Sequence, residues 1–284
     1  MIEVINPGLL GLIEDAGRFG LAHLGVPRSG AADGDSFDLA NRLVGNKPGA
    51  AAIELTYGSA ELRFGVDAWV AVTGAAVPLR LGGRPVATNQ AVRARTGDRL
   101  EIGVPLLGLR SYVAVGGGID VPLVLGSRSS DTLAGLGPAP LTPGDRLALG
   151  PAGTPPASPD VIRASISGLV PAPLEYRLGP RDDRFGPEVI ARLEATTWKV
   201  SAASNRVGVR LQGERLPVPS KDPLPSEGIV LGSIEVPPSG QPIVFLADHP
   251  TTGGYPVVGV LAVRSVARLA QLPPGSSVRF TRLF

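Results

Sequence analysis

The 284-residue sequence contains no cysteine, so disulfides and thiolate chemistry are both excluded. Its only histidines are His23 and His249. Two histidines without cysteine exclude a structural zinc site and make a catalytic metal site a weak interpretation. We therefore expect no metal centre.

Lysine is nearly as scarce, and the three present are Lys47, Lys199 and Lys221. None stands in the Gly-Lys-Ser/Thr context of a P-loop, and no Gly-x-Gly-x-x-Gly fingerprint opens a helix after a strand. None lies in the methionine-flanked turn that carries biotin, and no Gly-x-Ser-x-Gly elbow is present. If ATP or biotin is involved, another chain must supply it.

The sequence also lacks a strong charge of either sign, because 27 basic residues stand against 25 acidic ones. The arginines are scattered and not interleaved with aromatic residues, so nucleic acid is not an expected partner. The first seven residues carry no basic cluster, and uncharged stretches such as 68–79 are too short to span a membrane. We expect a cytoplasmic protein.

Glycine and proline, by contrast, are abundant, with 38 and 29 residues, and 43% of the chain is hydrophobic. This composition predicts many turns around a real core, which is typical of a β-rich protein. Short apolar runs predict buried strands at 69–73, 112–115, 242–246 and 257–261. A glycine turn followed by alternating apolar residues, the pattern of barrel or sandwich hairpins, recurs at 96–102, 143–149 and 274–280.

Few helices are expected. Residues 33–44 place apolar residues on one stripe, with Asp33 as the N-cap and Gly45 as the stop. Residues 187–195 begin with a proline, and residues 263–272 end before Pro273. The chain turns rich in proline, alanine and serine between 150 and 173, which predicts a boundary near residue 160. The two halves, 1–160 and 161–284, would be unequal β-rich subdomains.

A polar, glycine-hinged stretch follows the predicted strand 242–246 and spans residues 247–256. It gathers a carboxylate, an imidazole, hydroxyls and a phenol, and its paired glycines can adopt positive φ and bring backbone N–H groups close to a ligand. A rigid strand that ends in such a loop favours a site. The alternative is a wide hairpin whose Thr and Asp residues only satisfy turn backbone groups.

Four further clusters pair polar residues with glycine. The Asp15–Arg18 segment is a candidate for a site, and the alternative is a local ion pair in a turn. Ser29 lies just before the helix that starts at Asp33, where it could bind an anion or only cap the helix. Arg128 stands among hydroxyls, suited to a carboxylate or to an ordinary surface turn. The pattern of residues 204–211 predicts a strand with Arg206 and Arg210 on one face. These arginines could bind a carboxylate, or they could lie on a solvated strand face.

Taken in order, motifs across nearly the whole chain resemble the biotin-dependent carboxyltransferase family, whose members are also described as the C subunit of 5-oxoprolinase or as allophanate hydrolase subunit 2. Single motifs are weak, and the ordered set is specific. The motifs are Glu14-Asp15-x-Gly17-Arg18, Ser29-Gly30-Ala31-x-Asp33, Ala40-Asn41-Arg42-Leu43-Val44-Gly45-Asn46, Glu54-Leu55-Thr56, Thr73-Gly74-Ala75, Gly126-Ser127-Arg128-Ser129, Gly179-Pro180, Arg206-Val207-Gly208-Val209-Arg210-Leu211, Ser226-Glu227-Gly228, Pro237-Pro238-Ser239-Gly240-Gln241-Pro242 and Thr251-Thr252-Gly253-Gly254-Tyr255-Pro256.

The resemblance implies a mainly β chain with a few short helices, in two subdomains built around cyclophilin-like β-barrels. It also implies a partner, a protein like the B subunit of 5-oxoprolinase or allophanate hydrolase subunit 1, together with a third 5-oxoprolinase subunit. No cofactor would be bound covalently by this chain, and ATP, with biotin in a carboxylase, would come from partner subunits.

The sequence departs from the family pattern at five polar positions. Glu14, Glu235 and Pro250 stand where glutamine is usual, and Asn205 and Ser265 stand where aspartate is usual. A carboxylate in place of an amide exchanges a donor-acceptor group for an anionic acceptor. These departures bear on the substrate and on the activity.

The residues and the resemblance together favour one half of an ATP-dependent 5-oxoprolinase site, converting 5-oxo-L-proline to L-glutamate. Arg206 or Arg128 would hold a substrate carboxylate, the 251–255 loop would supply donors to an oxyanion, and Asp248 or His249 would move protons. The catalytic candidates are Asp248, Thr252 and Tyr255. The substrate-binding candidates are Arg18, Ser29, Asp33, Arg128, Arg206, Ser226, Gly253 and Gly254.

Two alternatives stay open. One is the carboxyltransferase half of a biotin-dependent urea or amide carboxylase or of an allophanate hydrolase complex. The other is a non-catalytic regulatory protein that binds a subunit-1-like kinase inhibitor. In all three cases we expect an obligate heteromer.

Overall fold

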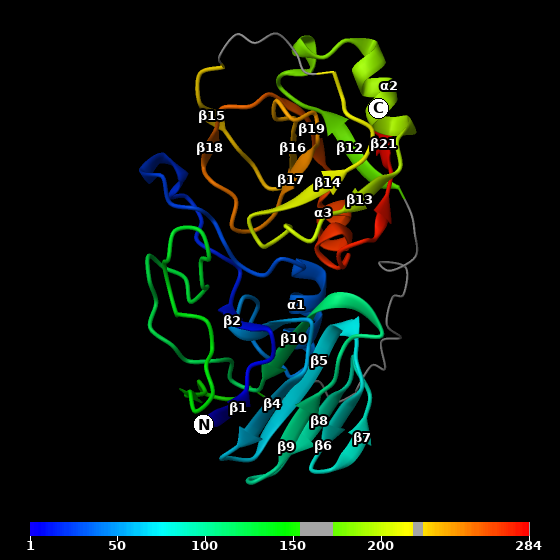
Figure 1. The fold of residues 1–284 in the computed structure, drawn as a ribbon. Helices are drawn as coiled ribbons and strands as arrows, with labels where there is room; N and C mark the ends of the chain where they lie inside the picture. The colour runs from blue at the N-terminus through cyan, green and yellow to red at the C-terminus, as the bar shows by residue number, and fades with distance from the viewer. Residues whose placement is uncertain (154–172, 218–223, 284) are drawn as a thin grey trace. The chain divides into compact units, whose positions relative to one another are not determined.

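The computed structural model describes residues 1–153, 173–217 and 224–283 (Figure 1). These described ranges form a mostly β protein with three short α-helices, as the sequence predicts. The chain divides into two compact units. Unit 1 comprises Met1–Arg18, Asp33–Asp131 and Gly135–Ser167, described up to Gly153. Unit 2 comprises Phe19–Ala32, Thr132–Ala134 and Gly168–Phe284. The boundary predicted near residue 160 lies outside the described residues.

Unit 1 contains two antiparallel sheets with one core between them. One sheet has the order β11-β1-β4-β9-β6-β7 and the other β2-β3-β10-β5-β8. The strands are β1 Ile2–Asn6, β2 Leu10–Glu14, β3 Ala52–Thr56, β4 Ala60–Phe64, β5 Ala68–Ala76, β6 Leu79–Leu81, β7 Arg84–Val86, β8 Ala91–Ala94, β9 Arg99–Ile102, β10 Leu107–Val115 and β11 Arg146–Leu147. Alternate residues of both sheets, such as Phe64 and Val113, meet in this core.

Helix α1 (Gly34–Leu43) covers the other face of the second sheet, where it packs on β5 and β10. Asp33 is its N-cap and accepts a hydrogen bond from the Ser36 N–H, which confirms the predicted start. Phe37 on the helix meets Tyr112 on β10 edge-to-face, with ring centroids 6.3 Å apart.

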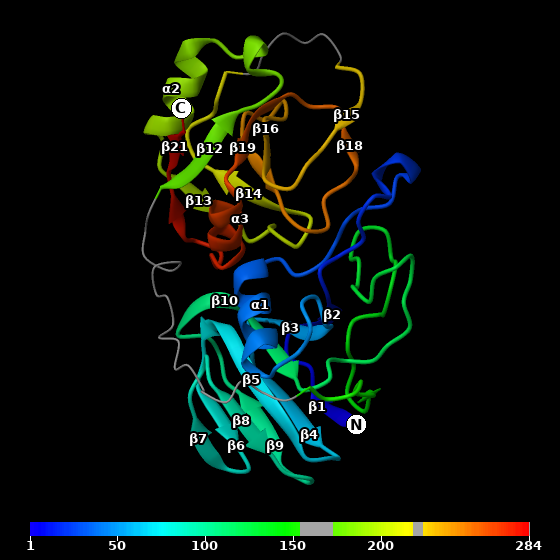
Figure 2. The same ribbon diagram turned by 180° about the vertical axis from the view of Figure 1, so that it is seen from behind.

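Unit 2 is built around one strongly curved sheet, ordered β20-β13-β14-β17-β16-β19-β12-β21 (Figure 2). Its outermost strands, β20 and β21, are separated by a single residue in the chain, so the sheet curls into a nearly closed barrel. The strands are β12 Leu174–Leu178, β13 Trp198–Val200, β14 Gly208–Gln212, β16 Ser233–Glu235, β17 Ile243–Phe245, β19 Val257–Leu261, β20 Ser277–Val278 and β21 Phe280–Arg282.

Two helices pack on this barrel, at the positions predicted from the sequence. They are α2 (Pro187–Ala195), which begins with its proline, and α3 (Val263–Ala270). Trp198 is fully buried in the barrel core and donates its indole N–H to the carbonyl of Leu193 at 3.0 Å, which joins β13 to α2.

A separate two-stranded ribbon consists of β15 (Glu227–Gly228) and β18 (Thr252–Gly253). Glu227 pairs with Gly253, and Gly228 pairs with Thr252. An ion pair between Glu227 and Arg181 ties the ribbon to the loop that follows β12. We call this element the β15–β18 ribbon. Two residues per strand give little stability on their own, so the ribbon depends on what lies beneath it.

Candidate functional site

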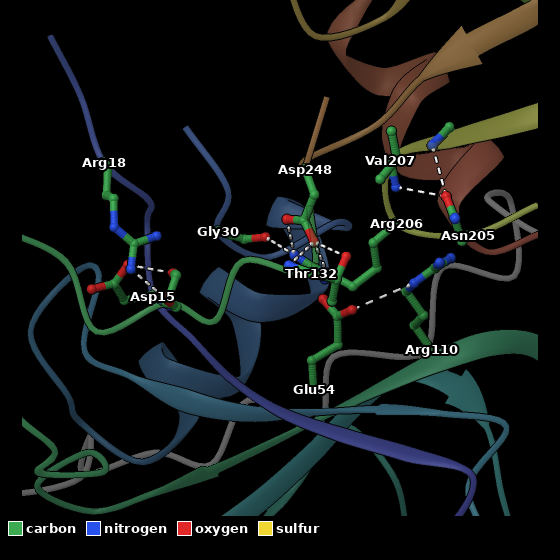
Figure 3. A network of polar contacts seen from close by, with 12 residues as sticks. Asp15, Arg18, Gly30, Glu54, Arg110, Thr132, Asn205, Arg206, Val207 and Asp248 are labelled. Atoms are coloured by element: carbon green, nitrogen blue, oxygen red, sulfur yellow. Dashed lines mark hydrogen bonds and ion pairs between the residues drawn. The ribbon is translucent and has the colours of Figure 1, made fainter. Parts of the chain in front are cut away.

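Arg206 and Asp248 form a buried ion pair in unit 2 (Figure 3). The guanidinium Nε lies 3.0 Å from Oδ2, and Nη2 lies 3.0 Å from Oδ1. Both side chains are at most 2% exposed. This is the two-point geometry in which a guanidinium binds a carboxylate most specifically.

Two segments that precede the barrel in the chain complete this cluster. Thr132 donates to Oδ2 of Asp248 from its backbone N–H at 3.0 Å and from its hydroxyl at 2.6 Å. The carbonyl of Gly30 accepts from Nη2 of Arg206 at 2.6 Å. Each charge is therefore satisfied by hydrogen bonds as well as by its partner, the condition under which a buried pair is tolerated.

The predicted carboxylate clamp thus holds a carboxylate of this chain. The expectation that Arg206 and Arg210 share a strand face is wrong, because β14 begins at Gly208 and Arg206 lies before it. Arg206 is buried, whereas Arg210 is exposed. The alternative that Asp248 only satisfies backbone groups of a wide hairpin is also incomplete, because its carboxylate binds Thr132 and Arg206, which lie far away in the chain.

Ser29, next to this cluster in the chain, has an unusual backbone. Its φ is 54° and that of Gly30 is 91°, so a serine occupies a left-handed conformation that favours glycine. Its side chain is 4% exposed, and its Oγ has no hydrogen-bond partner among the described residues. Strain together with an unused hydroxyl is typical of a functional position.

The 251–255 loop carries the other predicted residues of unit 2. Thr252 and Tyr255 are exposed at β18 and just after it, and Ser226 is exposed just before β15. Neither Gly253 nor Gly254 has a positive φ, contrary to the expected use of these glycines. Gly253 is required for space instead, because an added Cβ would lie 2.5 Å from Oε1 of Glu235.

Glu235 was missed as a site residue by sequence reasoning, which singled it out only as a departure from the family. It lies on β16, 4% exposed, opposite Ile243 and Val257 on the neighbouring strands. Burial raises the pKa of this carboxyl to about 7, and the Tyr255 N–H, which donates to it, lowers that pKa only in part. Oε1 has no hydrogen-bond partner among the described residues.

In unit 1, Asp15 is the centre of a second cluster. Its carboxylate accepts from the hydroxyls of Ser127 and Ser129, each at 2.6 Å, and from the Arg128 N–H. Burial acts to raise the pKa of Asp15, but these hydrogen bonds and that from the Gly17 N–H outweigh it and leave the pKa lowered. Hydrogen bonds to neutral groups therefore keep the carboxylate charged.

The guanidiniums of Arg18 and Arg128 lie at this cluster but bind groups other than the Asp15 carboxylate. Arg18 is 2% exposed and donates from Nε to the carbonyl of Val124 at 3.1 Å and from Nη2 to that of Ser129. The local Asp15–Arg18 ion pair offered as an alternative does not form in the described structure. The Arg128 guanidinium turns outward to Asp120.

Asp33 belongs to a third group, also in unit 1. Its N–H donates at 2.7 Å to the hydroxyl of Tyr112, which donates in turn to Glu54 at 2.9 Å. Glu54 also lies 3.4 Å from Nε of Arg110. Burial, followed by the nearby carboxylates of Glu54 and Asp33, raises the pKa of Tyr112 well above its usual value. Tyr112 is therefore a neutral hydrogen-bond relay.

Two other departures from the family pattern have local structural roles. Oδ1 of Asn205 accepts from the backbone N–H of Val207 at 2.9 Å and from that of Gly208 at 3.2 Å, which shapes the entry to β14 (Figure 3). Ser265 accepts from the Glu175 N–H at 2.8 Å. Glu235 differs from these two, because burial raises its pKa and its Oε1 has no hydrogen-bond partner among the described residues.

Within the described ranges, no group of three or more His, Cys, Asp or Glu side chains is arranged to hold a metal ion. No helix in those ranges is long and apolar enough to cross a membrane.

The family model for the carboxyltransferase domain, subdomains A and B, matches residues 24–282. The chain belongs to this carboxyltransferase family. The C subunit of the 5-oxoprolinase of Escherichia coli (strain K12) is 36% identical over 289 residues, which cover 99% of this chain and 91% of that relative. The urea amidolyase of Lachancea kluyveri is 34% identical over 304 residues, covering 98% of this chain and 17% of that protein.

Solved structures of relatives have the same fold. A crystal structure of TTHA0988 aligns with 99% of this chain at a TM-score of 0.86 and 35% identity. The K. lactis urea amidolyase aligns with all of it at a TM-score of 0.88 and 31% identity. This carboxyltransferase chain spans only 55% of the first structure and 19% of the second. In both relatives it therefore corresponds to part of a longer polypeptide.

Proposed function

We propose that this chain is a subunit of an ATP-dependent 5-oxoprolinase-type complex, which opens 5-oxo-L-proline to L-glutamate. The observation that carries the proposal is the end-to-end match to the C subunit of 5-oxoprolinase, which leaves only a small part of that relative uncovered. The urea amidolyases match over a much smaller share of their own length, 17% of the Lachancea kluyveri protein and 19% of the K. lactis protein.

The nucleotide belongs, in this proposal, to a partner subunit. Two of the arginines predicted to bind substrate are buried and already hydrogen-bonded within the chain. Arg206 binds Asp248, and Arg18 binds backbone carbonyls. Two engaged guanidiniums do not fit a triphosphate, which needs open cationic donors. The expected partner is a protein like the B subunit of 5-oxoprolinase, with a third subunit completing the complex.

The role of this chain is to bind and orient the cyclic amide. In unit 2 the Ser29 hydroxyl, which has no hydrogen-bond partner among the described residues, is available as a donor to the carbonyl oxygen, where negative charge develops. Thr252 and Tyr255 are exposed and can reach a ligand or the partner. Asp248 acts as a positioning residue, because it fixes Arg206 and Thr132.

The test is co-expression of this chain with the B-subunit-like protein and the third subunit, followed by an ATPase assay of the purified complex with and without 5-oxo-L-proline. We expect a single species of fixed stoichiometry whose ATP hydrolysis depends on 5-oxo-L-proline. A complex that hydrolyses no ATP in response to 5-oxo-L-proline would contradict the proposal. So would separate elution of the subunits at micromolar concentration.

A second function is favoured by one observation, the high TM-score with the urea amidolyase structure. In that case the chain is the carboxyltransferase part of a biotin-dependent urea or amide carboxylase. Urea- and bicarbonate-dependent ATP hydrolysis that requires a biotinylated partner would favour it over the 5-oxoprolinase.

A further inference from the structure

The carboxyl group of Glu235 lies between an apolar surface and the β15–β18 ribbon. Ile243 and Val257 flank it on the neighbouring strands, and Ile229 and Gly253 approach one another above it. Ile229 and Val257 belong, with Phe245, to a small apolar cluster outside the main barrel core. An ionised carboxylate is costly in such surroundings, so the neutral acid is favoured there.

The two oxygens of Glu235 are used differently. The Tyr255 N–H donates to the carboxyl group, and because Oε1 has no partner among the described residues, that bond goes to Oε2. A protonated carboxyl carries a donor on one oxygen and an acceptor on the other. With the proton on Oε1, the group presents an unused O–H, and Oε2 retains a second lone pair.

A donor and an acceptor side by side match one kind of ligand edge. In a cyclic amide or cyclic urea, the ring holds the carbonyl oxygen and the N–H on the same side. The O–H of Glu235 can donate to that carbonyl oxygen while Oε2 accepts from that N–H. An ionised carboxylate offers only acceptors and would leave the carbonyl oxygen unpaired.

The ribbon controls access to Oε1. The residues exposed on it or beside it include Gly228, Val230, Thr252 and Tyr255. The Glu227–Arg181 ion pair that secures it is only half-buried, so it opposes opening modestly. Because β15 and β18 do not belong to the barrel sheet, lifting the ribbon would break no strand pairing of that sheet.

We propose that Glu235, as the neutral acid, binds the cis-amide edge of a lactam or cyclic urea beneath the lifted β15–β18 ribbon. This inference rests on the proposed function and extends it, because it assigns recognition of the substrate's amide to one named side chain. The charged or titratable groups on the surrounding elements are Glu227 with Arg181, His249 and Tyr255. The Glu227–Arg181 pair is internally neutralised, and Nδ1 of His249 lies 2.8 Å from the Pro250 carbonyl.

The test is calorimetric titration of the full chain with 2-pyrrolidinone, a lactam, and with 2-imidazolidinone, a cyclic urea, at pH 6 and pH 8.5. With a pKa of about 7, the neutral acid falls from about nine-tenths to about 3% of the population. Wild-type affinity should therefore fall roughly 30-fold between the two pH values. Stronger binding of one probe identifies which ring class the site takes.

Variants separate the hydrogen bonds from packing. Glu235→Gln keeps a donor and an acceptor at every pH, so it should bind equally at pH 6 and pH 8.5. Glu235→Met fills the same space without them and should bind at least tenfold more weakly at pH 6. Glu214→Gln, an exposed control, should keep the wild-type pH profile. N-methyl-2-pyrrolidinone lacks the N–H and should bind at least tenfold more weakly than 2-pyrrolidinone.

The inference is overturned if wild-type protein binds neither probe at pH 6, or if its affinity is the same at both pH values. Equal binding by Glu235→Met also overturns it, and if that variant does not fold, the comparison of wild type with Glu235→Gln decides. Lactam binding with the expected pH profile, in a complex that does not hydrolyse 5-oxo-L-proline, would refute only the proposed function. Turnover that is unchanged in Glu235→Met would refute only the inference.

Discussion

Arg206 and Asp248, 42 residues apart in the chain, are joined through both their side chains and their backbones. Two side-chain contacts of 3.0 Å link the guanidinium to the carboxylate, and the Asp248 N–H donates to the Arg206 carbonyl at 3.1 Å. The pair fixes the entry to β14 against the exit from β17. It thereby sets the starting point of the 251–255 loop.

Replacing Asp248 by asparagine should strongly destabilise unit 2. The Arg206 charge would stay buried without its counter-charge, which typically costs about 3–5 kcal/mol in the free energy of unfolding. Urea denaturation followed by tryptophan fluorescence measures this, since Trp198 lies in the barrel core. Glu3→Gln removes one partner of the exposed Arg63–Glu3 pair and should cost at most about 1 kcal/mol. Equal effects of the two changes would contradict the role given to the buried pair.

Gly253 and Gly254 should respond differently to alanine. A Cβ at Gly253 would lie 2.5 Å from Oε1 of Glu235 and 3.0 Å from Cδ1 of Ile229, whereas one at Gly254 meets nothing within 4 Å. Gly253→Ala should therefore cost about 1–3 kcal/mol of stability and Gly254→Ala close to none. Thermal unfolding of both variants checks this, and an unaffected Gly253→Ala protein would show that the ribbon does not rest on Glu235.

The raised pKa of Glu235 makes stability depend on pH. Between the ordinary value of 4.5 and about 7, the unfolded chain loses this proton while the folded chain keeps it. The free energy of unfolding should therefore fall as the pH rises through this window and then level off, by about 3 kcal/mol at most. Glu235→Gln should remove this part of the slope. Denaturation curves at pH 4.5, 6, 7 and 8.5 measure it, and parallel profiles for the two proteins would argue against a buried neutral acid.

Asp15 should show the opposite dependence, because its folded-state pKa is lowered from 3.8. Its contribution to stability is present above that value and is lost as the pH falls through the folded-state pKa. Ser129→Ala removes a donor to the carboxylate and the acceptor of the Asp15 N–H, and should cost about 1–3 kcal/mol at pH 7. Ser130→Ala is the matched control, since the Ser130 Oγ has no hydrogen-bond partner in the described ranges. A larger loss in the control would count against this account of the cluster.

Local signals explain which parts of the fold could be predicted. The capping side chain of Asp33 and the first-turn proline of α2 act on their own segments, so the starts of both helices follow from the sequence. Glycine turns and apolar runs likewise mark most of the long strands.

Long-range pairing explains what the sequence could not reveal. Glu235 is buried among residues distant in the chain, with Ile243 and Val257 on the neighbouring strands and Gly253 of the ribbon close to its Oε1. The prediction that Arg206 shares a strand face with Arg210 was wrong because β14 begins at Gly208, two positions after Arg206. The sequence pattern does not fix the start of a strand that closely. Residues 19–32 and 132–134 belong to unit 2, although they lie far from it in the chain, and no compositional change marks them.

The most direct test of the account is glutamate formation by the purified complex supplied with ATP and 5-oxo-L-proline, with and without this chain. The account predicts that glutamate forms only when this chain is present, with ATP hydrolysed in step. A parallel reaction with urea, bicarbonate and a biotinylated partner should show no ATP hydrolysis. No glutamate in the first reaction, together with urea-dependent ATP hydrolysis in the second, would contradict the central claim.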